Sequence, residues 1–140
     1  MSQSNTQVGD IRVKAGMELT GKEGYLAKMN DAWGPVVELV KFTGDRPLYV
    51  ITEGAAVMKL ASVRPLDPGR NVRLKLSGTC NPGQVLVAIV DDAMSYGLVR
   101  ALPAEPGTYL GVAVAEEAGI EGQLVLARPS LIGNIVVAGT

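Results

Sequence analysis

The sequence contains no histidine, a single cysteine and only six aromatic residues. Histidine is the usual general base and the commonest metal ligand, so its absence excludes Ser-His-Asp and Cys-His arrangements and histidine-based zinc sites. One cysteine, Cys80, excludes an internal disulfide, and we expect it to be a small buried apolar residue in a reducing compartment. No catalytic residue, cofactor or metal site can be assigned, and we expect the protein not to be an enzyme.

The sequence also has no excess of charge of either sign, because 13 Lys+Arg nearly balance 14 Asp+Glu and the net charge is -1. Four basic residues gather between positions 64 and 75, but no aromatic residue lies among them to stack a base. We therefore expect no nucleic acid partner. The longest apolar run, Val85–Val90, is far shorter than the ~20 residues of a membrane-spanning helix, and the polar N-terminus has no signal-peptide pattern, so no membrane partner is expected.

What is present is turn chemistry, with 17 glycines and 8 prolines placed between short apolar runs. Two-residue alternation is clearest at residues 71–76, where apolar and basic side chains take opposite faces. The spacing predicts an all-β fold with little helix beyond one turn near Asp91–Met94. The expected strands are 10–14, 24–29, 36–42, 48–52, 56–60, 71–76, 85–90, 109–115, 122–127 and 131–138.

The chain divides into a flexible N-terminal arm, residues 1–9, and a single β domain, residues 10–140. The arm has no hydrophobic periodicity. Two prolines and a glycine in residues 64–70 predict an extended connector between two halves, 10–66 and 70–140. The halves echo each other faintly: Gly24 opens a segment similar to that at Gly83, Tyr49 and Tyr109 lie 60 residues apart, and Arg64 and Arg128 lie 64 apart. Such coincidences arise readily in strand-rich sequences, so both duplication and chance stay open.

The segments 85–90 and 109–115 are apolar on both alternating faces. In a chain this short, both faces can be covered only by a barrel or sandwich interior plus another layer, or by a neighbouring subunit. We favour a subunit contact for part of this surface. The expected interface residues are Val85, Val87, Ile89, Tyr109, Val112 and Val114.

Two patterns imitate catalytic motifs. Residues Gly16–Lys22 have the spacing of a phosphate-binding loop, but Glu23 stands where a magnesium-binding hydroxyl is needed and a strand pattern follows, so a turn is expected. The adjacent acids at 91–92 and 116–117 point to opposite sides of an extended chain and are expected in solvated turns. A carboxylate-only hydrolase remains a minor alternative, in which two carboxylates converge from the set Asp10, Asp45, Asp67, Asp91 and Asp92.

The second half resembles tailed-phage capsid decoration (cement) proteins. The resemblance rests on residues 77–88, 97–104, 106–117 and 122–125, with the cadence Pro-Gly-x-x-Leu, a short strand, and repeated Gly-x-aliphatic steps. It extends over roughly residues 20–130 and involves glycines and aliphatic residues without a reactive group.

This resemblance implies a small β-barrel-like or β-tulip domain that assembles, commonly as a homotrimer, on the outer surface of a viral head. It implies the major capsid protein as partner, a location on the virion, and synthesis in the host cytoplasm. The arm is then expected to add a strand to the capsid protein through Thr6, Gln7 and Val8. A fibre, baseplate or tail module of the same particle is the alternative.

Overall fold

The computed structural model describes residues 9–31, 34–47 and 49–139. The predicted all-β class is confirmed, and the one helical element in these ranges is the 3-10 turn η1 (Ala93–Ser95), which Asp92 caps. A three-residue turn is far too short to cross a bilayer, and the described residues contain no membrane-spanning helix. The strands are β1 (Ile11–Ala15), β2 (Leu26–Asn30), β3 (Val36–Leu39), β4 (Tyr49–Glu53), β5 (Leu60–Pro65), β6 (Val72–Lys75), β7 (Val85–Ala88), β8 (Val99–Ala101), β9 (Gly107–Ala115) and β10 (Leu124–Val137).

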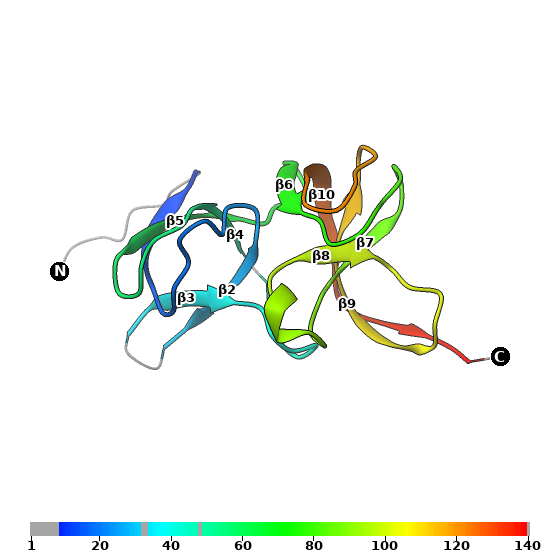
Figure 1. The fold of residues 1–140 in the computed structure, drawn as a ribbon, viewed down its shortest axis with the longest axis horizontal. Coiled ribbons are helices and arrows are strands. Elements are labelled where there is room, and N and C mark those ends of the chain that lie inside the picture. The colour runs from blue at the N-terminus through cyan, green and yellow to red at the C-terminus, as the bar shows by residue number, and fades with distance from the viewer. Residues whose placement is uncertain (1–8, 32–33, 48, 140) are drawn as a thin grey trace.

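The strands form two bodies that lie side by side (Figure 1). Strands β1 to β5 close into a barrel in the order β1-β3-β2-β4-β5, here called the N-terminal barrel. Strands β6 to β10 form a five-stranded sheet in the order β6-β10-β9-β7-β8, here called the C-terminal sheet. Alternation places side chains such as Val13, Val37, Ile51 and Val63 inside the barrel, where they form its own core. Residues 64–70, predicted as a connector, comprise the last two residues of β5 and most of the loop that leads to β6.

The two bodies share a second core. Three N-terminal residues, Leu26, Val40 and Val50, belong to the hydrophobic cluster of the C-terminal sheet. Backbone hydrogen bonds also cross, because the Leu26 N–H donates to the Gly97 carbonyl at 2.8 Å and the Lys75 N–H donates to the Gly24 carbonyl at 2.9 Å. The halves are therefore packed together as one unit.

The two bodies have the same topology. When β6 to β10 are matched in order to β1 to β5, every antiparallel pair of the barrel has its counterpart in the sheet. The parallel β1–β3 pair that closes the barrel also has a counterpart, a single parallel bridge between Leu76 and Val99. The C-terminal sheet is thus the same arrangement, closed by one bridge instead of a ladder.

The match extends to the register. Arg64 on β5 lies opposite Val50 on β4, and Arg128 on β10 lies opposite Val114 on β9, each arginine being followed by a proline. The 64-residue spacing of the two arginines is therefore a true repeat. The 60-residue spacing of the tyrosines is a coincidence, because the counterpart of Tyr49 in this register is Ala113.

Three strand predictions need correction. Residues 56–60, predicted as a strand, form a turn in which Met58 has a φ of 67°, and β5 starts at Leu60. Strand β8 was not predicted, because three residues are too few to show alternation. The predicted strands 122–127 and 131–138 are one strand, β10, whose register shifts between Pro129 and Gly133. A proline within a strand pattern marked an irregularity there and not an end.

Candidate assembly surface

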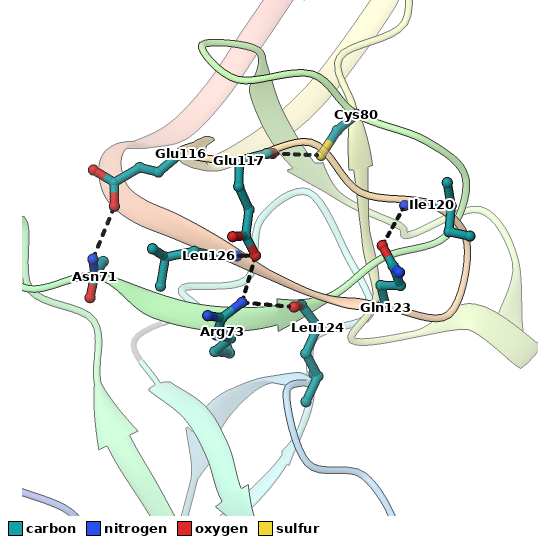
Figure 2. A network of polar contacts seen from close by, with 9 residues as sticks. All are labelled: Asn71, Arg73, Cys80, Glu116, Glu117, Ile120, Gln123, Leu124 and Leu126. Carbon is teal, nitrogen blue, oxygen red and sulfur yellow. Dashed lines mark hydrogen bonds and ion pairs between the residues drawn. The ribbon is translucent and has the colours of Figure 1, made fainter.

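Each half carries a polar trio at equivalent positions. In the N-terminal barrel, Asp10 accepts hydrogen bonds from the Thr52 hydroxyl (2.6 Å) and from Arg64 Nε (2.8 Å). The C-terminal trio, Asn71, Glu116 and Arg128, is centred on Glu116, which accepts from Asn71 Nδ2 (3.2 Å) and from Arg128 Nε (3.0 Å). Figure 2 shows the Asn71–Glu116 bond at the edge of the sheet. The carboxylate has changed place between the halves, while the arginine has kept its position.

Hydrogen bonding to the ionised form lowers the pKa of both central carboxyls. For Asp10 the Thr52 hydroxyl contributes most, and Arg64 adds a hydrogen bond and its positive charge, so the pKa lies below the ordinary 3.8. For Glu116 the main cause of the lowered pKa is Arg128, followed by Asn71. Both central carboxyls are therefore ionised at neutral pH, and each links neighbouring strands on the outer surface.

Glu117 forms a second link beside this trio. Its carboxylate accepts from Arg73 Nη1 at 2.5 Å and from the Leu126 N–H at 3.0 Å, and Arg73 also donates to the Leu124 carbonyl (Figure 2). Residues 116–117 form a bend with Glu116 exposed, in line with the predicted solvated turn. The prediction did not include these contacts, because cross-strand partners are not visible in sequence spacing.

The carboxylates of the hydrolase alternative have separate structural partners. Asp45 accepts from Lys28 Nζ (2.8 Å) and from two backbone N–H groups of its own loop. Burial opposes ionisation of Asp45, but these hydrogen bonds outweigh it and its pKa lies below 3.8. Asp67 accepts from the Gly69 N–H, Asp91 pairs with Arg100, and Asp92 caps η1.

The phosphate-loop imitation lies in a turn region, and the cysteine lies in the core. Residues 16–22 form bends and turns, as predicted, with Leu19 fully buried. Cys80 is buried, as predicted, and burial raises the pKa of its thiol. In the described part of the chain, no three His, Cys, Asp or Glu side chains are grouped to hold a metal ion.

The predicted subunit interface is only partly available. Val87, Ile89 and Val112 are at most 4% exposed and are covered by the chain itself, so they cannot supply contact area to another subunit. Their burial comes from packing inside the C-terminal half, which the sequence pattern could not distinguish from a subunit contact. Three predicted residues retain exposed surface: Val85, Tyr109 and Val114.

A second exposed apolar feature is the end of the C-terminal sheet. Beyond the repeat, residues 107–111 of β9 and 133–137 of β10 pair as a two-stranded ribbon that leads to the chain's C-terminal end (Figure 1). Residues 130–139 contain neither a charged residue nor proline, and Val136 is 72% exposed. The free edge of β10 thus lacks the charges and prolines that usually prevent strand addition.

Residues Thr6, Gln7 and Val8, predicted to contact a capsid, lie outside the described residues. The first described residues, Gly9 and Asp10, lead into β1 at the end of the molecule opposite the ribbon (Figure 1).

The fold is similar to that of the N base of head fiber gp8.5 in bacteriophage phi29, known from a crystal structure. The TM-score is 0.65 with 18% sequence identity, and the match covers 89% of this chain and 95% of that one. At this identity the similarity concerns the fold. No protein-family model matches the sequence. No curated protein matches it either.

Proposed function

We propose that this chain is a structural protein of a phage particle, which decorates the outer surface of the capsid as a homo-oligomer. The observation that carries the proposal is the match of nearly the whole fold to the base of a phage head fibre. The exposed apolar surface of the C-terminal half supports it, as do carboxylates whose hydrogen bonds and ion pairs hold strands, turns and loops in place.

The expected oligomer is a trimer, and the expected partner is the major capsid protein. Several modest contacts would suffice, because attachment of one subunit makes the contacts of its neighbours effectively intramolecular. In this proposal the arm, through Thr6, Gln7 and Val8, adds a strand to the capsid protein.

The test is co-sedimentation of the purified protein with capsids of its phage that lack it, at physiological salt. We expect the protein in the capsid pellet, and a chain lacking residues 2–9 should bind more weakly while keeping its thermal transition. Protein that stays in the supernatant contradicts the capsid proposal. Equal affinity of the truncated chain contradicts the role of the arm.

A second candidate is the base of a fibre, because the similar structure is itself a head fibre base. Electron cryomicroscopy of the particle distinguishes the two. Density on many lattice positions with no attached shaft supports decoration, and density at the foot of a shaft supports a fibre base.

A further inference from the structure

The repeat gives the two halves equivalent outer faces. Leu26 on β2 lies opposite Val50 on β4, and Val85 on β7 lies opposite Val114 on β9 in the same register. A third position follows from the backbone, because the Val40 N–H donates to the Leu26 carbonyl as the Leu102 N–H donates to the Val85 carbonyl. We call Leu26, Val40 and Val50 the junction triad, and Val85, Leu102 and Val114 the outer triad.

The two triads have the same chemistry but different surroundings. The junction triad is at most 2% exposed, because it points out of the N-terminal barrel into the core of the C-terminal sheet. Every member of the outer triad is half-buried and belongs to neither core. An apolar face that is fully buried in one copy of the repeat is therefore only partly covered in the other.

The glycine beside each triad shows the same contrast. Gly24 and Gly83 are equivalent, with φ of 86° and 88°, and each donates a 2.8 Å hydrogen bond to the strand beside it. A Cβ on Gly24 would lie 2.2 Å from Leu124 Cδ2, because the C-terminal sheet packs directly on this glycine. A Cβ on Gly83 would meet nothing within 4 Å. The surface for a close contact is present at Gly83, but the contacting residue is not.

The rim of the open face is polar. Glu116 and Arg128 form their ion pair next to Val114, since Arg128 lies opposite Val114 in the strand register. An apolar centre with a charged rim is the usual composition of a protein–protein interface.

We propose that the outer triad binds a second copy of this chain, through the face of its N-terminal barrel that corresponds to the one packed on Gly24. Within the chain, that covering face contains Leu124 and Lys75, which pair across β10 and β6. The equivalent pair in the N-terminal barrel is Leu60 and Lys14, across β5 and β1. Leu60 is 50% exposed and borders an open groove of about 350 Å³ on the barrel surface.

The occupant is a second copy because the chain already contains this interface once. The outer triad matches the junction triad position by position, so a barrel of this type is the partner that it fits. The matching Leu60 face lies on the other half of the molecule, so the contact joins head to tail between chains. Such contacts produce closed rings or open filaments. This inference rests on the trimer of the proposed function. In a closed ring of three chains, six repeats would be joined by internal and intermolecular contacts in alternation.

The test uses two full-length variants, one for each side of the contact: Val85→Lys and Leu60→Lys. We expect the wild type to self-associate in light scattering and sedimentation, and each variant to associate about 30-fold more weakly, as for loss of a central contact residue. An equimolar mixture is the decisive measurement. Each variant keeps the face that the other lacks, so a head-to-tail contact predicts a one-to-one heterodimer that neither variant forms alone.

The control is Met94→Lys, which adds the same charge at an 89% exposed apolar residue on η1, outside both faces; it should assemble as the wild type does. If Val85→Lys fails to fold, Leu60→Lys still decides, because its side chain is exposed. A monomeric wild type, or assembly unchanged by Leu60→Lys, overturns the inference. Capsid binding by a monomeric wild type would contradict this contact and the proposed homo-oligomer but not the capsid role, whereas an oligomer that does not bind capsids would contradict the capsid role and leave this contact standing.

Discussion

The N-terminal barrel and the C-terminal sheet use one topology and one register, yet one is closed by a ladder and the other by a single bridge. Where the first and third strands of each half meet, the two halves share one hydrogen bond: Gly16 donates to the Val37 carbonyl at 2.8 Å, and the equivalent Ser77 donates to the Val99 carbonyl at 2.8 Å. In the barrel the pairing continues through Lys14–Val36 and Ala15–Val37, whereas in the C-terminal sheet it is limited to Leu76–Val99. The same contact is therefore extended in one half and minimal in the other.

The comparison also shows which side chains are free to change. The interior positions stay aliphatic in both halves, whereas the surface trio exchanges Asp10 and Thr52 for Asn71 and Glu116 around an unchanged arginine. What is retained is one carboxylate within reach of one guanidinium.

The largest expected effect separates the two triads. Leu26→Ala removes a fully buried side chain at the junction and should lower the free energy of unfolding by about 4 kcal/mol through the cavity it leaves. Val85→Ala, at the equivalent half-buried position, should cost about 1 kcal/mol in the isolated chain. Urea unfolding measures both, and we expect one transition because the halves share a core. Equal losses would contradict the difference in burial.

A pair of glycine substitutions measures the junction contact itself. Gly24→Ala and Gly83→Ala impose the same strain, about 1 to 2 kcal/mol, because both residues have positive φ. Gly24→Ala should cost about 1 kcal/mol more than Gly83→Ala, since its Cβ also meets the end of the Leu124 side chain and lies 3.3 Å from the Lys75 backbone nitrogen. The difference between the two melting curves reports the contact, and no difference would show that Leu124 moves away freely.

Acid should weaken both halves. The pKa values of Asp10, Asp45 and Glu116 lie below the ordinary 3.8 to 4.5, so the unfolded chain binds more protons in this range. Stability should be constant near neutral pH and decline as the pH falls below about 4.5, through the lowered pKa values. Thermal melts across pH 2 to 7 test this. The double variant Asp10→Asn, Asp45→Asn should show a shallower decline, and curves parallel to the wild type would contradict the assignment.

The smallest effect is expected from exchanging the trio. Asp10→Asn combined with Thr52→Glu transplants the C-terminal arrangement onto Arg64, and the melting temperature should stay within about 2 °C of the wild type. The single variant Asp10→Asn leaves Arg64 without its carboxylate and serves as the reference. A double variant less stable than this reference would show that the two surfaces are not interchangeable.

Much of the fold follows from the sequence because alternation and turn residues are local signals. They located most strands, the turn capped by Asp92 and the connector after Arg64. The register of the repeat did not follow, because the identical equivalent residues, such as Lys14 and Lys75 or Leu60 and Leu124, are scattered singly along the two halves. The sequence could not separate covered from exposed interface candidates: Val85 and Val87 look alike in sequence, and only the packing of the second half shows that Val87 is buried while Val85 keeps exposed surface.

The ribbon at the end of β10 has a practical consequence for the free protein. Residues 130–137 of β10 contain neither charge nor proline, and their edge away from β9 has no partner strand in the described residues, so they form a template for strand addition by other chains. The isolated protein, stored at high concentration without its binding partners, should therefore slowly form ordered aggregates that bind thioflavin. The substitution Val136→Lys, at a side chain that is already exposed to solvent, should slow this aggregation.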